Sequence, residues 1–271
     1  MDYGYQVLRH VLQQVFGNIG AAARITLILL AIPAIVLIAT NPWLLSGQAM
    51  QTAFAPDAVE GPTANAFGLF IGAILGILCW IWAAVAWHRF VLLEEYPNGA
   101  LPAWRGPNIL NYFGNILLIG LVLILASLAF GLVISIVSAA FGNVAILFLL
   151  GIGLVFGLTW VSTRIGLILP AAAIGEKLTI NESWKATAPV SGQIVLPIFV
   201  IALAFGLIGQ LIIAAFGSTS PVEFGGQTFE QVTLSTPGLI LNIAVSWVQM
   251  LVNLALMTTL YGNLIEGRQL N

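Results

Sequence analysis

Hydrophobic positions along this chain form six long runs separated by short polar segments. A helix needs about 20 apolar residues to cross the hydrocarbon core of a bilayer, and backbone polar groups in lipid must be bonded within each span. The pattern therefore predicts an all-α fold, a polytopic six-helix transmembrane bundle that forms one integral membrane domain over residues 1–271. The expected spans are residues 21–40, 66–87, 115–139, 144–169, 194–216 and 239–261.

Two shorter segments have the pattern of helices that lie along a membrane surface. In residues 2–16 apolar side chains recur at helical spacing opposite polar ones, which is typical of an interfacial helix. In residues 180–188 the spacing of Thr179 and Glu182 is that of a capping box, and Pro189 disfavours helical geometry at the residue before it. We expect both segments to be interfacial helices.

The basic residues predict the orientation of the chain. All eight Lys and Arg lie in, or at the borders of, the segments before spans one, three and five and after spans two, four and six. The connections at residues 41–65 and 217–238 contain none. Positive charge gathers on the cytoplasmic side, so both termini should be cytoplasmic. The size of the chain and the lack of a recognisable eukaryotic sorting signal indicate a bacterial inner membrane.

An internal repeat divides the chain into three parts. A basic residue is followed eight to ten residues later by Gly17-Asn18, by Gly114-Asn115 or by Gly192-Gln193, and a pair of spans comes next. This predicts three hairpins, each preceded by a cytoplasmic interfacial segment, rather than the inverted halves of many transporters.

Composition narrows the classes of function. The chain is 60% hydrophobic and 7% charged, with a mean hydropathy of +1.04, so the bilayer must be part of its solvent and membrane lipids are expected partners. A net charge of −2 provides no basic field for nucleic acid. The single cysteine, Cys79, follows the pattern of membrane packing more closely than that of a reactive thiol.

No pattern of enzyme chemistry is visible. No charged residue lies near the middle of a span, which argues against a proton relay. We find no nucleophile motif, phosphate loop or metal-ligand spacing, and so expect no enzyme, no cofactor and no catalytic or metal site. His10 fits a solvated residue better than a ligand or proton switch. His88 fits an interfacial residue better than a functional one, and Glu94 and Glu95 fit a solvated pair or partners of nearby arginines better than an acid and base.

Four residues are expected to anchor the chain at the membrane interface: Arg89, Arg164, Trp184 and Lys185. A long arginine side chain can reach the head groups from a helix end. A tryptophan ring is stable at head-group depth, and a lysine beside it can meet anionic lipid. The alternative for the segment around Trp184 is a docking site for another protein.

The last span has a polar face. Asn242, Ser246, Gln249 and Asn253 recur at intervals of four, three and four residues, which places them on one narrow side of a helix. In lipid this side should point inward. It either bonds neighbouring helices or lines a polar cavity or a path for a small solute or lipid head group.

Small residues mark one face of the second span. Gly68, Gly72 and Gly76 are spaced so that another helix can approach closely. The helix that approaches can belong to this bundle, to a second copy of the chain or to another membrane protein.

One stretch resembles a known family. The sequences R-I-G-L-I-L-P-A-A-A-I-G at residues 164–175 and N-E-S-W-K-A-T at residues 181–187 are similar to a pattern in bacterial integral membrane proteins. These include the membrane domain attached to some glycerophosphodiester phosphodiesterases and its stand-alone relatives, most of which have no assigned activity. The resemblance implies a six-helix membrane fold. The soluble phosphodiesterase domain and its metal-binding cluster have no counterpart here. The matching residues are Arg164, Leu169, Pro170, Ala171, Ser183 and Trp184.

Together these patterns predict a non-enzymatic membrane protein that acts as a binding or scaffold component within the bilayer. The alternative is a facilitator or carrier for a small solute or lipid, built on the polar face of the last span.

Overall fold

The apolar runs form long helices, arranged as three hairpins. The computed structural model describes residues 3–45, 65–224 and 227–270. The helices are α1 (Tyr3–Gly17), α2 (Ile19–Thr40), α4 (Ala66–Leu93), α5 (Gly106–Phe141), α6 (Val144–Ile165), α7 (Ile168–Ile174), α8 (Ile180–Thr187), α9 (Ser191–Phe216) and α10 (Thr236–Leu264), with short 3₁₀ turns η1 (Pro42–Leu45) and η2 (Ala188–Val190).

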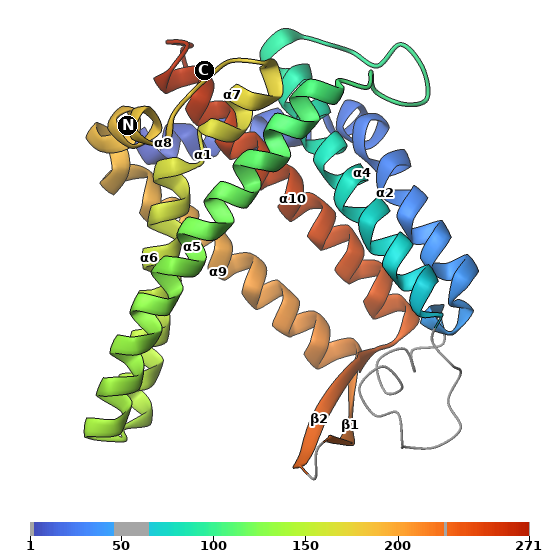
Figure 1. Ribbon diagram of the computed structural model, residues 1–271, viewed down its shortest axis with the longest axis vertical. Helices are drawn as coiled ribbons and strands as arrows, with labels where there is room; N and C mark the ends of the chain where they lie inside the picture. The colour runs from blue at the N-terminus through green and yellow to red at the C-terminus, as the bar shows by residue number, and fades with distance from the viewer. Residues whose placement is uncertain (1–2, 46–64, 225–226, 271) are drawn as a thin grey trace.

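Six segments of the described chain are long and apolar enough to cross a membrane, so the predicted multi-pass helical fold is confirmed. The hairpins are α2 with α4, α5 with α6, and α9 with α10. Figure 1 shows them meeting at one end of the molecule, where both termini, α1, α7 and α8 also lie. We call this the charged end, because the eight Lys and Arg lie there. The opposite end is the far end.

The helices differ in detail from the expected spans. The third begins at Gly106 instead of residue 115, because the expected surface segment is the first part of the continuous helix α5. The second continues to Leu93. The fourth is interrupted after Ile165, and its last turns form the separate helix α7.

Helix ends are closed by the polar side chains that precede them. Asn65 accepts a hydrogen bond from the backbone N–H of Gly68, and Asn143 accepts from the first turn of α6. At α8 the predicted capping box is present, since Thr179 and Glu182 bond each other's backbone N–H groups. These caps satisfy donors that have no partner within the helix.

The connection between the last two spans contains the two strands of the described chain. The sequence analysis made no prediction of strands in this connection, where two antiparallel strands, β1 (Gly217–Phe224) and β2 (Gln227–Leu234), join α9 to α10, with Gly217 opposite Leu234. Threonine and valine in these segments favour strands once the backbone has left the bilayer. Strand β1 follows α9 directly and β2 leads to α10 through Ser235, so the hairpin extends the far end (Figure 1).

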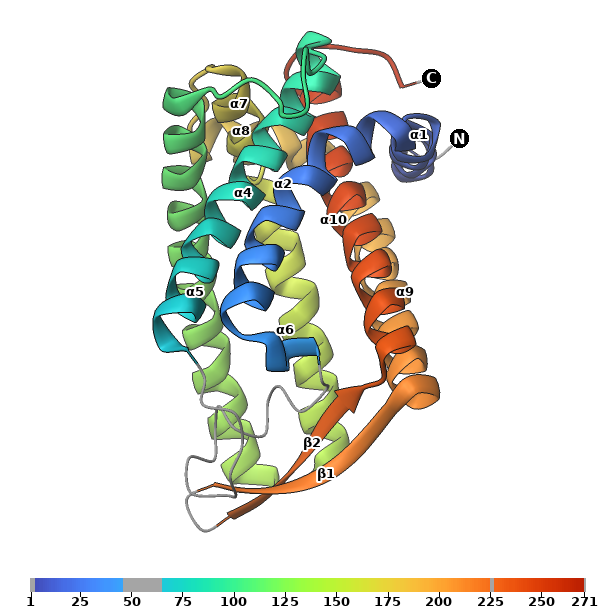
Figure 2. The ribbon, with the colours of Figure 1, turned by 90° about the vertical axis from the view of Figure 1, so that its right-hand side faces the viewer.

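The buried core gathers at the charged end. Helix α1 crosses this end beside α10 (Figure 2), and its apolar side, with Val7, Val11 and Val15, is buried. It packs on α9 and α10. The apolar face of the predicted interfacial helix is therefore covered by protein.

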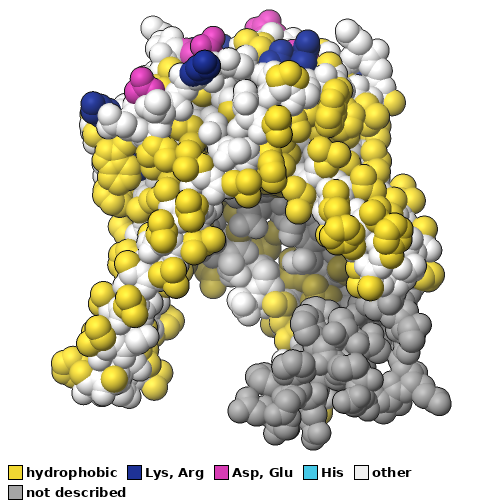
Figure 3. Space-filling model, viewed as in Figure 1, with side chains coloured by type: hydrophobic (Ala, Val, Ile, Leu, Met, Phe, Trp, Pro, Cys, Tyr) yellow, Lys and Arg dark blue, Asp and Glu magenta, His cyan; other side chains and the backbone are white. Residues whose placement is uncertain are grey.

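The far half is more open. Buried residues of α5 are confined to Ile109 and Tyr112, and those of α6 to Thr163, Arg164 and Ile165, all near the charged end. Figure 1 shows the α5–α6 hairpin diverging from the others. Figure 3 shows the resulting recess between the α5–α6 hairpin and the rest of the molecule. We refer to it below as the recess.

The glycine face of α4 is used inside the chain. A Cβ atom on Gly68 would lie 2.4 Å from the Cβ of Thr40, and one on Gly72 would lie 2.3 Å from a methyl carbon of Leu37. These two glycines therefore let α2 approach α4 closely, as small residues do between membrane helices. A Cβ atom on Gly76 would lie 3.9 Å from the Cβ of Pro33, so Gly76 is farther from α2.

Candidate functional site

A buried histidine joins three helices at the charged end. The Nδ1 of His88 in α4 lies 2.7 Å from the hydroxyl of Thr258 in α10, and its Nε2 lies 3.2 Å from the hydroxyl of Tyr112 in α5. The Thr258 hydroxyl donates to the carbonyl of Leu254. Each group has a partner if Tyr112 donates to Nε2 and a neutral His88 donates from Nδ1. His88 is thus a bonded core residue, whereas the sequence pattern favoured an interfacial one.

Glu95 joins two arginines beside this histidine. Its carboxylate accepts from Nε of Arg89 at 2.9 Å and from Nη2 of Arg105 at 3.0 Å. Arg89 also donates to the carbonyl of Ala173 at the end of α7. Burial raises the pKa of Glu95, but hydrogen bonds and positive charge from Arg89 and Arg105 outweigh it and leave the pKa below its usual value. Of the two glutamates, Glu95 is therefore the partner of the arginines.

The short helix α7 is held by amide side chains of α5. Asn115 donates to the carbonyl of Ile168, and Asn108 donates to the carbonyl of Ala173 at 2.8 Å. Helix α7 has only 7 residues, so many of its carbonyls lack a partner within the helix. The amides satisfy part of this need and fix α5 against α7.

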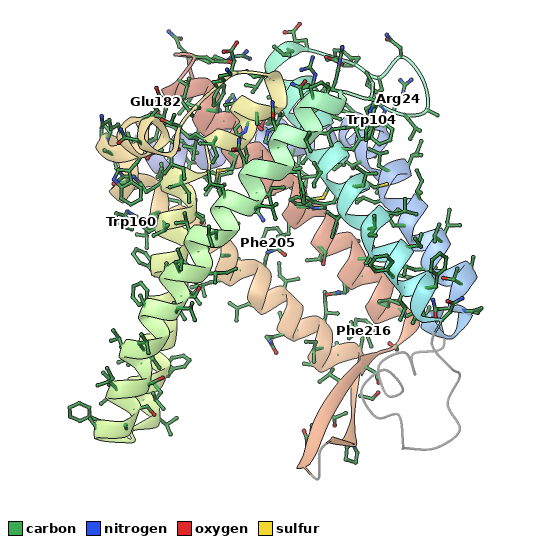
Figure 4. All side chains as sticks on the ribbon, viewed as in Figure 1. Arg24, Trp104, Trp160, Glu182, Phe205 and Phe216 are labelled. Carbon is green, nitrogen blue, oxygen red and sulfur yellow. The ribbon has the colours of Figure 1, made fainter. Side chains whose placement is uncertain are left out.

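Arg164 and α8 bond each other reciprocally. The guanidinium of Arg164 lies 4.2 Å from the ring centre of Trp184 and 5.6 Å from that of Trp160, and it donates to the carbonyl of Trp184. In return, the hydroxyl of Ser183 donates to the carbonyl of Arg164 at 2.7 Å. Figure 4 shows Trp160 on α6, below α8. This contact joins residues 164–175 to residues 181–187, the two stretches that carry the resemblance described above.

Arg164 and Arg89 lie inside the protein at the positions expected to anchor the chain. Arg164 is only 6% exposed, and the Arg89 side chain is 13% exposed. Trp184 is half-buried and Lys185 is exposed. An interfacial anchoring role stays a prediction for all four residues, and the two arginines also make contacts that join elements of the fold.

The polar face of α10 is turned toward the recess. Met257 of α10 lies against Gly166, which follows α6. A Cβ atom on Gly166 would be only 2.7 Å from the Met257 sulfur. Residues four apart share a helix face, so Asn253 lies on this side one turn farther from the charged end. Ser246 continues the same side. Ser246 and Asn253 are exposed, and Asn242 and Gln249 are half-buried.

These four polar side chains share a second property. Within the described part of the chain, Asn242, Ser246, Gln249 and Asn253 make no hydrogen bond. An amide without a partner in an apolar medium costs several kcal/mol. The described part of the chain thus leaves these groups available for something that enters the recess.

The hydroxyl partners of His88 at the charged end were not predicted from the sequence. The sequence does not single out Tyr112 or Thr258, because a single tyrosine or threonine near a span end is common in membrane helices. The available signal was the pairing of a histidine with hydroxyl residues at a similar depth in other spans. Cys79 is buried with Leu29 and Ala83, as its pattern predicted.

The described residues contain no cluster of three or more His, Cys, Asp or Glu that could hold a metal ion. Comparison of the chain with protein-family models, with curated proteins and with solved structures gives no match. The fold defines a multi-pass α-helical membrane protein. The resemblance to the phosphodiesterase membrane domains stays a prediction.

Proposed function

We propose that this protein is a non-enzymatic component of the bacterial inner membrane that binds an amphiphilic molecule in the recess. The observation that carries the proposal is the polar face of α10, whose exposed Ser246 and Asn253 have no hydrogen-bond partner in the described chain. A ligand with a neutral polar group would bond these side chains. Its apolar part would lie along the surrounding apolar helices.

The shape of the molecule supports binding over simple helix association. If the polar face served to bond neighbouring helices, its amides should already be paired in the folded chain. They are unpaired in the described chain, while His88, Asn108 and Arg164 at the charged end bond residues of other helices. Among the described residues the three hairpins meet at the charged end, and the α5–α6 hairpin diverges from the others, which would leave the recess accessible from within the bilayer (Figures 1 and 3).

The binding proposal is tested by replacing Asn242, Gln249 and Asn253 together with Leu. The variant should keep the wild-type unfolding midpoint in detergent and lose amphiphiles that co-purify with the wild type, measured by mass spectrometry of extracts. Ser135→Leu is the control, since Ser135 is exposed on α5 and bonds only its own helix. If the triple variant loses stability or assembly, the polar face bonds helices instead. If it retains the wild-type set of amphiphiles, the recess is not the binding site.

A facilitator for a small solute or lipid is the second candidate. The polar positions extend from Asn242 to Asn253, about 16 Å along a helix that rises 1.5 Å per residue, so a molecule moving along α10 would meet successive partners. Flux through liposomes distinguishes the two functions. The facilitator requires transport by the wild type that the triple variant lacks, and binding without flux excludes it.

The proposed orientation places the charged end in the cytoplasm. Two single-cysteine proteins in a Cys79→Ser background test it, with the cysteine at the exposed Lys185 or at the exposed Glu230. An impermeant thiol reagent should label Glu230→Cys in intact spheroplasts, and Lys185→Cys only after permeabilisation. The reverse pattern would contradict the orientation.

A further inference from the structure

An apolar groove lies between α4 and α5, close to the charged end. Its volume is about 430 Å³. Side chains one helical turn apart on each helix form its walls, and almost no polar surface is exposed in it. The wall residues are Ile74, Ile77 and Leu78 of α4, and Ile109, Leu110 and Phe113 of α5.

The groove is closed at its base and open toward the bilayer. Ile81 and Ile109 at the base are 3% and 5% exposed. The outer walls are not covered by any other part of the described chain, since Ile77 is 56% exposed and Leu110 is 68% exposed. Apolar side chains this exposed are stable only against hydrocarbon or another apolar surface.

A fixed tryptophan stands at the charged end of the groove. The ring of Trp104 packs edge-on against Trp82 at 4.9 Å between ring centres, and the indole N–H of Trp82 donates to the carbonyl of Ala103. Trp104 itself is 54% exposed. Such a ring, apolar in body and polar at its N–H, is suited to the depth where acyl chains meet head groups.

Positive charge exceeds negative charge beside this tryptophan. Glu95 bonds both Arg89 and Arg105, and Arg24 lies near the same segment, donating to the carbonyl of Gly99. Counting Glu94, which precedes Glu95 in the sequence, this region contains three arginines and two glutamates. Figure 4 shows Arg24 and Trp104 at this corner of the molecule.

Arg105 is the cation best placed to meet a ligand. Its side chain is 48% exposed, and Nε and Nη2 bond the same carboxylate oxygen. Nη1 has no partner in the described chain. A phosphate can accept charge-assisted hydrogen bonds from such a group.

We propose that this groove binds one acyl chain of an anionic phospholipid, with the phosphate at Arg105 and the chain between α4 and α5. The occupant is set by two features together: an apolar groove open to the bilayer, and a net positive cluster with an exposed tryptophan at its head-group end. The site is distinct from the polar face of α10. It remains intact in the triple Leu variant described above, so the two proposals can fail separately.

Native mass spectrometry in a mild detergent tests the site, with phosphatidylglycerol and phosphatidylcholine supplied in equal amounts. The wild type should retain phosphatidylglycerol about five-fold more, as expected for one arginine acting on an anionic lipid. Arg105→Gln should lose this preference and still retain lipid. The double substitution Ile77→Phe with Leu78→Phe fills the groove and should lower retention of both lipids about ten-fold.

Matched controls and a second measurement complete the test. Lys185→Gln removes an exposed basic residue elsewhere, and Leu121→Phe with Ile124→Phe enlarges exposed residues of α5 outside the groove; both should behave as wild type. Should the groove-filling pair lower the unfolding midpoint, acyl chains carrying bromine are added to otherwise unaltered protein. The brominated chains should quench the tryptophan fluorescence of the wild type more than that of the Trp104→Phe variant.

Three outcomes would overturn the proposal. Equal retention of the two lipids by the wild type, or no effect of filling the groove, would mean that lipids only surround the protein without selection. Equal quenching of wild type and Trp104→Phe would place no acyl chain near Trp104. A disulfide between two copies through Leu110→Cys, in a Cys79→Ser background, would show that a second chain covers the groove.

Discussion

Polar side chains in two regions of α10 differ in whether they form hydrogen bonds within the described chain. Near the charged end, Thr258 bonds His88 and a carbonyl of its own helix. Farther from that end, Ser246 and Asn253 are exposed and bond nothing in the described chain. The same helix therefore contributes a completed hydrogen-bond network to one region and an open polar surface to the other.

This difference separates two physical roles. At the charged end, arginine, histidine and amide side chains cross-link helices through charged and neutral hydrogen bonds, which fixes the three hairpins at one end. The outer half of α5 and α6 has almost no buried residue, so its position depends on what surrounds it. The charged end is expected to determine stability, and the recess is expected to determine binding.

The largest predicted loss of stability is at Arg164. Arg164→Ala removes a charged hydrogen bond to the Trp184 carbonyl, the contacts with two tryptophan rings, and buried volume between α6 and α8. We expect a loss of about 3 kcal/mol in the free energy of unfolding. Equilibrium unfolding in mixed detergent micelles, followed by tryptophan fluorescence, measures it.

Lys185→Ala is the control for Arg164→Ala. Lys185 is also basic and adjoins Trp184, but its side chain is exposed and makes no bond in the described chain. Its loss should change the free energy of unfolding by less than about 0.5 kcal/mol. Equal effects of the two substitutions would show that the charged end is not held by the contacts of Arg164.

The spans could be predicted from the sequence because hydropathy and length decide them. A run of more than 20 apolar residues has one low-energy solution in a bilayer. The capping box at Thr179 was also predictable, since it depends on residues three apart. The strands β1 and β2 were not, because their pairing depends on a turn and on how two helix ends are placed.

The repeat and the site show the limits of local patterns. Asn18, Asn115 and Gln193 occupy equivalent positions in the sequence, but Asn115 bonds the carbonyl of Ile168 across helices while Asn18 bonds only Gln14 of the preceding helix. The spacing of the polar residues in α10 predicted a common face. Whether that face met another helix or a recess depended on how the α5–α6 hairpin packs, which no short pattern specifies.

A smaller, pH-dependent effect is expected at Glu95. Its lowered pKa arises because hydrogen bonds and charges of Arg89 and Arg105 outweigh the effect of burial. The carboxylate therefore stabilises the fold fully above the unfolded value of about 4.3, and this contribution is lost as the pH falls through the lower folded pKa. Glu95→Gln should cost about 2 kcal/mol at pH 7.

The measurement for Glu95 is the difference in unfolding free energy between wild type and Glu95→Gln from pH 7 to pH 3. The difference should shrink below about pH 4, where the wild-type carboxylate takes up a proton. Arg105→Gln should cost less than Arg89→Gln, because Arg105 is 48% exposed and Arg89 is 13% exposed. A difference that stays constant with pH would mean that the Glu95 ion pairs do not contribute.

The smallest effect compares two hydroxyl groups on α10 directly. Thr258→Val and Ser246→Ala each delete one hydroxyl from the same helix. Thr258→Val leaves Nδ1 of the fully buried His88 without its partner, so it should cost about 1 to 2 kcal/mol. Ser246 bonds nothing in the described chain, and Ser246→Ala should leave the unfolding free energy unchanged, since alanine also suits a helix slightly better. If the Ser246 variant is destabilised as much as the Thr258 variant, the serine is already bonded within the fold, and the outer half of α10 is not the open surface on which the proposed binding depends.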